Sequence, residues 1–287
     1  MTFSIVGFDE KTKELGIAVA SKFLGVGAVV PFAKAGVGAI ATQSLANLSY
    51  GVEGLELLEK GLSPLEVVEE LTKKDDNAAW RQVGIVDVTG QSATYTGEDC
   101  YDWAGGAAAK NYAIQGNILV NQQVVEQMEA TFEQTNGPLP ERLLAALLAG
   151  DAAGGDSRGR QSAALLVVKE NGSYGGYTDR YIDLRIDDHH DPVQELSRLL
   201  KLRHLYFEKA DQADVMTLTE SQQSQLAEHL HTLGYLEHST ATAEEIHVGL
   251  DRYHHTENFE ERQQPSGQID RKVFEYIEEQ AKGFTAK

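Results

Sequence analysis

The sequence predicts an α+β fold in which antiparallel sheets lie in layers and helices cover their outer faces. Three observations lead to this class. Segments with the alternating or wholly apolar pattern of strands come in runs rather than singly. Segments with the spacing of amphipathic helices come in pairs between those runs. Such blocks favour layered antiparallel sheets over a doubly wound parallel sheet, in which strands and helices alternate one by one.

The first block of strands starts at the N-terminus. Residues 2–8 alternate and are rich in β-forming side chains, and residues 15–21 are apolar almost throughout, as expected when both faces of a strand are covered. We expect these two strands to form a hairpin. Two shorter strands are predicted at residues 28–32 and 36–42, bounded by glycine and proline.

Two helices follow, each with its own signal. One opens at Tyr50 and carries leucines at helical spacing. A second begins at Ser63, because a serine cap, a proline at the first helical position and a glutamate at the third form a typical helix start. The remaining predictions are strands at 81–88, 91–96 and 113–119, helices at 121–135 and 139–149, a glycine-rich segment at 150–159, and strands at 161–169 and 180–186.

The composition changes near residue 190. All nine histidines lie at or after His189, and glycine becomes scarce beyond it. We therefore expect an α/β domain over residues 1–190, a linker helix over 191–210 and a small all-α domain over 211–287. In the last of these, large apolar residues recur at the spacing of helices that pack on one another.

The charge and the apolar pattern limit the partners. The formal net charge is −19 at pH 7, and such a surface repels phosphate groups, so we expect neither nucleic acid nor a membrane as a partner. Solubility is the simpler explanation of the acidity, and a cationic substrate or partner is the alternative. No apolar run approaches the roughly 20 residues that span a bilayer. Since the N-terminus also lacks the pattern of a signal peptide, we expect a cytoplasmic protein.

The available side chains exclude several classes of enzyme. Residues 1–188 contain no histidine, and Cys100 is the only cysteine, so this part of the chain cannot form a Ser-His-Asp or Cys-His pair or a histidine- or cysteine-based metal site. No P-loop and no dinucleotide fingerprint are present. We expect no cofactor and no metal, and any catalysis in this domain needs a base other than imidazole.

An N-terminal threonine would supply such a base. An α-amino group has a pKa of about 7.7–8.0, so a useful fraction is neutral near pH 7, and it lies close enough to its own hydroxyl to accept that proton. Removal of Met1 is expected because Thr2 is small. Lys22 and Lys34 are the cations that would favour the neutral amine. The simpler interpretation is that Thr2 is only the residue after the initiator methionine.

Several long motifs carry a resemblance to a known family. They cover residues 2–7, 15–23 and 29–43, the run Gly154-Gly155-Asp156-Ser157-Arg158-Gly159-Arg160-Gln161-Ser162, and shorter matches at Tyr50-Gly51 and Gln115-Gly116-Asn117. Nearly all of residues 1–190 thus resembles an uncharacterised bacterial family with an N-terminal-nucleophile-hydrolase-like fold. The resemblance implies a four-layer αββα sandwich with Thr2 at the tip of the first strand. It implies no established activity.

The same resemblance implies roles for individual residues near Thr2. Ser21 ends the second strand, where related proteins carry an acid that positions the nucleophile, so the usual charge network is altered. Lys34 matches, by its order in the chain, the lysine of the third strand. The backbone around Thr42, Gln43 and Ser44 corresponds to the segment that donates to the oxyanion.

Substrate contacts are expected from two further places. The glycine-rich block brings Asp156, Arg158, Arg160 and Ser162 toward the same cleft. Its alternative role is a tight turn held by a buried pair between Asp156 and one of the two arginines. Asn47 and Gln115 are also candidates to line the cleft, with structural hydrogen bonding as the simpler role for each.

The C-terminal part resembles a peptidoglycan-binding domain. The resemblance rests on the residues from Leu226 to the Leu-Gly-Tyr-Leu run at 233–236, on residues 243–253, and on the Gly-Gln-Ile-Asp run at 267–270. The absence of an export signal argues against contact with the cell wall. The alternative is a helical appendage that serves oligomerisation or binds soluble muropeptide-like ligands.

These observations lead to two hypotheses of function. In the first, the protein is an amide hydrolase with Thr2 as nucleophile and its α-amino group as base, acting on a small peptide, an acyl-amino compound or a cell-wall fragment. In the second, it is a catalytically inactive binding protein that recognises a muropeptide-like ligand, as the replacement of an acid by Ser21 suggests. We expect a homodimer through the large domain, since cyclic dimers are the commonest oligomers.

Overall fold

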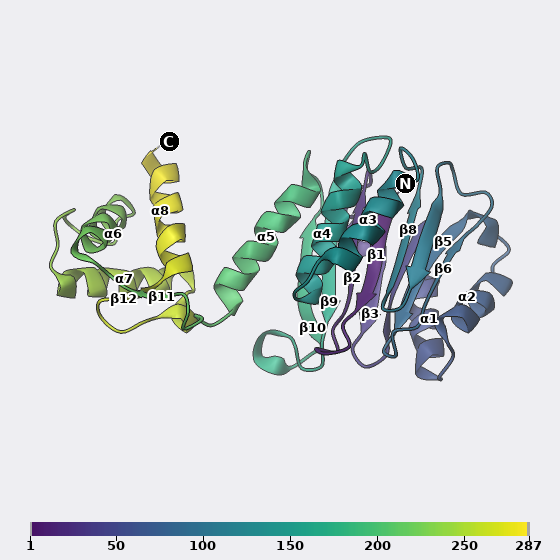
Figure 1. Cartoon of the computed structure of the whole chain (residues 1–287), viewed down its shortest axis with the longest axis horizontal. Coiled ribbons are helices and arrows are strands. Elements are labelled where there is room, and N and C mark those ends of the chain that lie inside the picture. Colours follow the sequence, from purple (N-terminus) through teal and green to yellow (C-terminus); the bar gives the residue numbers. More distant parts are fainter. Residues whose placement is uncertain (1, 286–287) are drawn as a thin grey trace. The chain divides into compact units, whose positions relative to one another are not determined.

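The computed structural model of the chain describes residues 2–285, which fall into two compact units that divide between Leu199 and Leu200. We call them the N-terminal and the C-terminal unit. The strands of the N-terminal unit are β1 (Thr2–Phe8), β2 (Leu15–Ser21), β3 (Pro31–Lys34), β4 (Gly38–Ser44), β5 (Arg81–Asp87), β6 (Ser92–Thr96), β7 (Gly105–Ala109), β8 (Tyr112–Asn117), β9 (Ser162–Val168) and β10 (Arg180–Ile186). Its helices are α1 (Ser49–Glu59), α2 (Pro64–Lys73), α3 (Gln123–Gln134) and α4 (Leu139–Ala152), and α5 (Pro192–Phe207) runs across the division (Figure 1).

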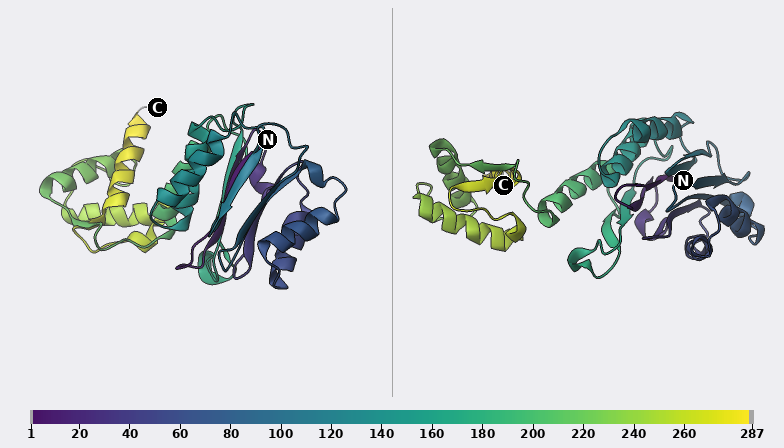
Figure 2. Two further views of the ribbon diagram at one scale, coloured as in Figure 1. Left: turned by 45° about the vertical axis from the view of Figure 1, so that its right-hand side comes forward. Right: turned by 60° about the horizontal axis from the view of Figure 1, so that its bottom comes forward.

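Two antiparallel sheets form the N-terminal unit. Their strand orders are β10-β9-β2-β1-β8-β7 and β3-β4-β5-β6. The sheets face each other, with α3 and α4 on the outer face of the larger sheet and α1 and α2 on the outer face of the smaller one (Figures 1 and 2). The predicted mixed class with antiparallel sheets is therefore confirmed. The relation of this arrangement to the N-terminal-nucleophile hydrolases stays a prediction.

The space between the sheets is apolar at one end of β1 and polar at the other. Val6 and Phe8 are fully buried in the core that joins the two sheets. Thr2 and Ser4, at the start of the same strand, instead bond to the side chain of Gln43 on the facing sheet. Since alternate residues of a strand point to one face, these four side chains line the same interior. The start of β1 is thus the polar end.

The predicted strand at residues 28–32 is wrong. Val26–Ala28 form a 3-10 turn entered from Gly25, whose φ of 65° lies in the left-handed region, and β3 begins only at Pro31. The amide of Val30 donates to the carbonyl of Val26, and both valines are buried in the core between the sheets. The turn lies where the chain passes from β2 in the larger sheet to β3 in the smaller sheet.

Strand β7 was not predicted. Its sequence, Gly-Gly-Ala-Ala-Ala, consists of residues that are depleted in strands. It forms at the edge of the larger sheet because its backbone pairs with β8 from Gly105 to Ala109. Pairing with an already formed neighbour therefore outweighs the local preference here.

The C-terminal unit is helical with one small sheet. It contains α6 (Glu220–Thr232), α7 (Ala243–Glu257) and α8 (Arg271–Thr285), and the short strands β11 (Val215–Thr217) and β12 (Gln268–Asp270) pair with each other. The helical character is as predicted, but the all-α prediction is wrong because of this strand pair. Three residues per strand are too few to show a pattern in the sequence.

A buried ion pair organises the C-terminal unit. The guanidinium of Arg262 lies 2.6 Å from the carboxylate of Asp270, and their side chains are 1% and 0% exposed. Arg262 also donates to the carbonyls of His204 and Leu205 at the end of α5. The side chain of Leu205 belongs to the core of this unit. The end of α5 is therefore part of the C-terminal unit, whereas a linker over residues 191–210 had been expected.

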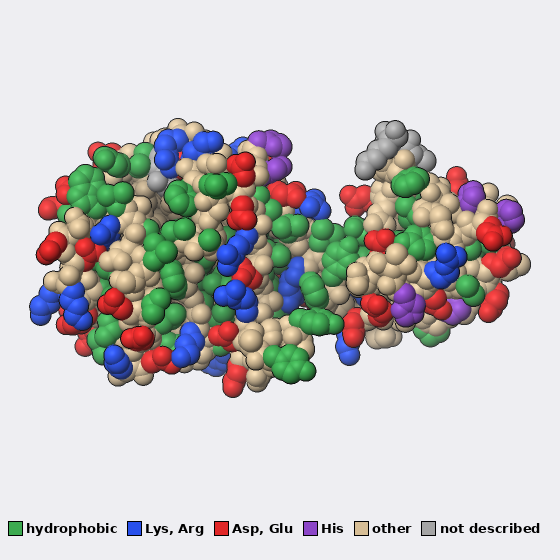
Figure 3. Space-filling model, turned by 180° about the vertical axis from the view of Figure 1, so that it is seen from behind, with side chains coloured by type: hydrophobic (Ala, Val, Ile, Leu, Met, Phe, Trp, Pro, Cys, Tyr) green, Lys and Arg blue, Asp and Glu red, His purple; other side chains and the backbone are tan. Residues whose placement is uncertain are grey.

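Helix length and surface charge both bear on what the protein can contact. None of the helices within residues 2–285 is long and apolar enough to cross a bilayer. On the face drawn in Figure 3, acidic side chains are interspersed with lysines and arginines rather than gathered into one patch. The negative net charge is thus spread over that face.

The buried pair leads to a first prediction. Asp270→Asn leaves the guanidinium of Arg262 buried without a counter-charge, and losing one partner of a buried pair costs about 3–5 kcal/mol. We expect the C-terminal unit of this variant to unfold at a much lower urea concentration, as followed by circular dichroism. Glu278→Gln removes an exposed partner of Lys282 and is the control, with a midpoint near that of the wild type. Equal midpoints for both variants would contradict this account.

A second prediction concerns pH. Burial lowers the pKa of His254 from its ordinary value of 6.5, so the ring is neutral in the folded C-terminal unit. When the pH falls through 6.5, the unfolded chain binds a proton that the folded chain rejects, and the free energy of unfolding decreases. Urea titrations at pH 7.5 and pH 5.5 should show this loss. It should be smaller in His254→Leu, and a loss of the same size there would rule out this residue as its origin.

Candidate functional site

A row of small polar side chains crosses the larger sheet at the start of β1. Thr2 of β1 is paired with Asn117 of β8, and Ser21 of β2 is paired with Ser162 of β9. The hydroxyl oxygens of Thr2 and Ser21 lie 3.2 Å apart, which joins the two pairs across the middle of the sheet. Four neighbouring strands therefore place one polar residue each in the same row.

The row is nearly closed to solvent. Thr2 is 6% exposed, and the three other side chains are buried more completely. The side-chain amide of Gln43 donates to the carbonyl of Thr2 over 3.2 Å, so the smaller sheet holds the backbone of Thr2 in place. Ser21 thus contacts the hydroxyl of Thr2, and Gln43 of the facing sheet holds its backbone.

Behind Thr2 lies a buried network of amide and hydroxyl groups. Gln43 accepts from the hydroxyl of Ser4 at 2.6 Å and donates to Gln82 at 2.8 Å. Gln115 donates to the hydroxyl of Ser4, and Asn117 donates to Gln82. The five residues come from four strands of both sheets, and all of these bonds join neutral groups. The network therefore links the sheets without placing a charge behind Thr2.

One glycine makes room for this network. A Cβ atom at Gly84 of β5 would lie 1.8 Å from the side-chain oxygen of Gln115. No side chain other than hydrogen fits between the sheets at that point. Gly84 therefore allows Gln115 to reach across the space and bond to Ser4.

Thr2 lines a pocket of about 480 Å³, which we call the Thr2 pocket. Most of its wall is apolar, and three of its large apolar residues are about half exposed. The residues that form it are Thr2, Phe23, Val26, Val29, Val30, Gln43, Ser44, Leu45, Ala46, Leu48 and Arg81. Ser44 has a φ of 70°, a conformation that few residues other than glycine adopt and that often marks a functional constraint.

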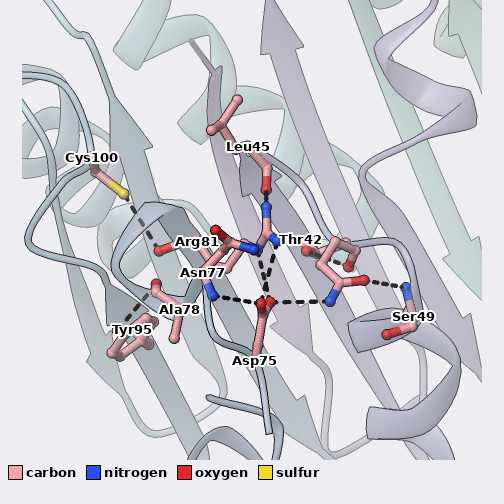
Figure 4. A network of polar contacts seen from close by, with 10 residues as sticks. Thr42, Leu45, Ser49, Asp75, Asn77, Ala78, Arg81, Tyr95 and Cys100 are labelled. Atoms are coloured by element: carbon pink, nitrogen blue, oxygen red, sulfur yellow. Dashed lines mark hydrogen bonds and ion pairs between the residues drawn. The ribbon is translucent and has the colours of Figure 1, made fainter. Parts of the chain in front are cut away.

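The cation in this wall is tied to a carboxylate. Arg81 lies 2.8 Å from Asp75 and also donates to the carbonyl of Leu45 (Figure 4). Both side chains of the pair are largely buried. The Arg81 guanidinium, together with the amides of Asn77 and Asn47, holds the pKa of Asp75 well below its ordinary value. The pair is therefore ionised and internally neutralised, and it fixes the backbone at the rim of the pocket.

A second pocket of about 460 Å³ lies on the side of Ser21, and we call it the loop pocket. Its charged lining residues include Asp151, Asp156 and Arg160. Asp151 binds Arg160 at 2.7 Å, and Asp156 binds Arg158 at 3.3 Å. Asp156 also accepts from the amide of Lys22, so it fastens the glycine-rich loop to the end of β2.

Ser162 connects the two pockets. It is a lining residue of the loop pocket, and its hydroxyl donates to the carbonyl of Phe23 and accepts from the amide of Val26. Phe23 and Val26 in turn line the Thr2 pocket. The glycine-rich block thus lies beside the Thr2 pocket rather than in its wall. Ser162 bonds to Phe23 and Val26, which do form part of that wall.

Two expected neighbours of Thr2 lie elsewhere. Lys34 pairs with Gly38 at the start of β4 and forms an ion pair with Glu59, whereas Gln43 contacts Thr2 near the end of that strand. Five residues of a strand span about 16 Å, so Lys34 is not the cation beside Thr2. The side chain of Thr42 points away as well, because alternation turns it to the helix side, where it donates to the carbonyl of Asn47.

The other expected substrate contacts have structural partners. The side-chain amide of Asn47 donates to Asp75 at 3.1 Å. Gln115 is fully buried between the sheets. Ser44 alone among the predicted substrate-binding residues lines the Thr2 pocket. Met1, whose removal would free the α-amino group of Thr2, lies outside the described residues.

The sequence prediction missed Gln82, Asn117 and Arg81. A signal for the first two was present, because each is an amide side chain in a segment of strand with large apolar residues, where an unpaired polar group would be costly. Arg81 carried no such signal at the start of its strand. Within residues 2–285 the structure brings together no group of three or more His, Cys, Asp or Glu side chains that could hold a metal ion.

Comparison with known proteins agrees with this architecture. No curated protein matches the chain. A crystal structure of a protein from Silicibacter pomeroyi matches with a TM-score of 0.65 and 31% sequence identity, covering 71% of this chain and 89% of that one. That protein is described as a member of the DUF1028 family.

The two parts of the sequence match different families. Residues 206–277 match a family described as a putative peptidoglycan binding domain. Residues 2–196 match a family described as a family of unknown function, DUF1028. Because this second match spans most of the chain and the crystal structure supports it, the protein belongs to the DUF1028 family.

Proposed function

We propose that the protein is an amide hydrolase in which Thr2, once Met1 is removed, is the nucleophile. The observation that carries the proposal is the position of the Thr2 hydroxyl. It lies in the wall of a pocket of about 480 Å³, 3.2 Å from the hydroxyl of Ser21, on a strand that both sheets hold in place. A fixed hydroxyl beside a cavity is what acyl transfer to an oxygen nucleophile requires.

The α-amino group of Thr2 is the base that fits this surrounding. The network behind Thr2 joins neutral groups, and the first 188 residues contain no histidine. The amine would take the proton of the hydroxyl as the oxygen attacks the carbonyl carbon of the amide. It would then pass that proton to the leaving nitrogen as the C–N bond breaks. Water would cleave the resulting ester and restore the threonine.

Three neighbours have supporting roles in this mechanism. Ser21 would orient the Thr2 hydroxyl through the bond between them. Gln43 would hold the carbonyl of Thr2, and with it the position of the amine. The backbone at Ser44 turns out of β4 in a strained conformation at the pocket wall, which supports the proposal that amides of this segment meet the developing oxyanion.

The fold gives independent support. Two facing antiparallel sheets between two pairs of helices have the order of layers of an αββα sandwich. In N-terminal-nucleophile hydrolases, which the sequence resembles, the first strand presents the nucleophile at its tip. Here β1 begins with Thr2 at the polar end of the inter-sheet space. We propose that the N-terminal unit is a sandwich of this kind.

A third prediction follows from the proposed nucleophile. A β-lactone probe that acylates N-terminal threonine should add its mass to Thr2, in protein that has lost Met1. Thr2→Val keeps the shape of the side chain but removes the hydroxyl, so labelling should fall by about a thousandfold or more. Thr2→Ser keeps a hydroxyl and should still be labelled. Intact-mass spectrometry followed by peptide mapping measures both events.

The matched control is Thr12→Val, the same change at an exposed threonine in the turn after β1. It should be labelled as the wild type is. Retention of Met1, or equal labelling of Thr2→Val and wild type, would show that Thr2 is not the nucleophile.

A second candidate function is binding without catalysis. The observation that favours it is the match of residues 206–277 to a family described as a putative peptidoglycan binding domain. The sequence resemblance, which implies that Ser21 replaces an acid of related enzymes, agrees with it. In this proposal the C-terminal unit recognises a cell-wall-related ligand such as a soluble muropeptide. Homodimer formation stays a prediction under either function.

The binding proposal gives a fourth prediction. A soluble disaccharide-peptide muropeptide titrated into the full chain should release or absorb heat, with the same affinity for Thr2→Val as for wild type, because the C-terminal unit carries the site. At a urea concentration that unfolds the C-terminal unit of Asp270→Asn but not that of the wild type, Asp270→Asn should lose this binding, while Glu278→Gln keeps it. Unchanged binding by Asp270→Asn would place the site outside the C-terminal unit.

A further inference from the structure

We infer that the Thr2 pocket accepts an aliphatic group attached to the acyl carbon of the amide substrate. This inference rests on the proposed role of Thr2, because the pocket lies directly beside that hydroxyl. An acyl group bonded to the Thr2 oxygen would have to lie in the cavity that this oxygen lines. The chemistry of the wall therefore determines which acyl groups fit.

The wall is apolar over most of its extent. Val26 and Val30 are almost completely buried at its base. Around it, Phe23 is 50% exposed, Leu45 is 55% exposed and Leu48 is 45% exposed. Large apolar side chains grouped around a cavity on a protein surface mark a site where an apolar partner is bound.

The cation in the wall is not available to bind a charged acyl group. The guanidinium of Arg81 donates to both carboxylate oxygens of Asp75 and to the carbonyl of Leu45. An acyl group that carried a carboxylate would have to compete for Arg81 with Asp75, which is already ionised and bound to it. An acyl group that carried an ammonium would lose its hydration among valines and leucines without a free counter-charge.

The loop pocket shows the contrast. It has nearly the same volume, but its lining includes Asp151, Asp156, Arg160 and His190. Thr2 faces the apolar pocket, and Ser21, its hydrogen-bond partner, faces the charged one. Polar parts of a ligand therefore have suitable partners on the Ser21 side, whereas the Thr2 side suits an alkyl chain or a leucine-like side chain.

The fifth prediction tests this with a homologous series. Acetyl, butanoyl, hexanoyl and octanoyl glycinamide are titrated into the full chain carrying Thr2→Val, which lacks the proposed nucleophile, so that calorimetry measures binding without cleavage. Burial of each methylene group contributes about 0.8 kcal/mol, so affinity should rise roughly fourfold per methylene until the pocket is filled. Succinyl glycinamide, with a carboxylate at the end of its acyl group, should bind more weakly than butanoyl glycinamide.

Matched variants locate the effect. Leu45→Asp and Leu48→Asp place a carboxylate in the wall and should remove most of the dependence on chain length. Leu65→Asp is the control, because Leu65 is 61% exposed on α2 and does not line the pocket. Circular dichroism of each variant checks that the fold is kept.

The outcomes separate this inference from the proposed function. Affinity that does not change with chain length, tighter binding of the succinyl compound, or equal effects of all three variants would each overturn the aliphatic pocket. If affinity rises as expected but no compound is cleaved by the wild type and no probe labels Thr2, the pocket stands and the proposed hydrolase fails. To separate the two sources of an aliphatic group, 4-methylpentanoyl glycinamide, which has the carbon skeleton of a leucyl group without its ammonium, is compared with hexanoyl glycinamide, which has the same number of carbon atoms. Tighter binding of the former indicates a leucine-like side chain and of the latter a linear fatty acyl group.

Discussion

The side-chain amide of Gln43 joins the two sheets of the N-terminal unit through hydrogen bonds to residues of three other strands. It reaches from the smaller sheet to the carbonyls of Thr2 and Gln115 and to Gln82, and it accepts from Ser4. Each buried amide group left without a hydrogen bond costs about 1–3 kcal/mol, and both the amide nitrogen and the oxygen of Gln43 have partners. The two sheets must therefore keep the spacing and register that satisfy Gln43, and this requirement fixes where the start of β1 lies.

A neutral network has consequences for reactivity. A carboxylate behind Thr2 would favour a protonated amine, and a lysine would favour a neutral one. Here the hydroxyl of Ser21 and the side-chain amide of Gln43, which are both neutral, hydrogen-bond to Thr2. The charges of this region are paired at its borders, as Asp75 with Arg81 and Asp151 with Arg160. The hydrogen-bonded interior of the site is therefore polar and neutral, and the ion pairs lie at its borders.

The sequence predicted the strands and helices of the N-terminal unit well where periodicity was strong. It failed at β7, where alanine and glycine form a strand only because β8 offers a partner, and at Val26–Ala28, where a turn connects the two sheets. Among site residues, Thr2, Ser21 and Gln43 meet, because the start of β1 and the ends of β2 and β4 lie at the same edge of the two sheets. Lys34 does not, because order along the chain says nothing about which end of a strand a residue occupies. The role of Arg81 and Asp75 depends on contacts between distant segments, which no local pattern reveals.

The residues that line the Thr2 pocket come from two kinds of segment. Thr2 and Gln43 stand on strands, where a change of residue disturbs register and the network between the sheets. Phe23, Leu45 and Leu48 lie outside the strands and helices, in the segments after β2 and β4. Such segments tolerate substitution and insertion far better than the scaffold that carries them. Residues of these segments can therefore change with little disturbance to the position of Thr2, so the lining of the pocket and the placement of its threonine can vary separately.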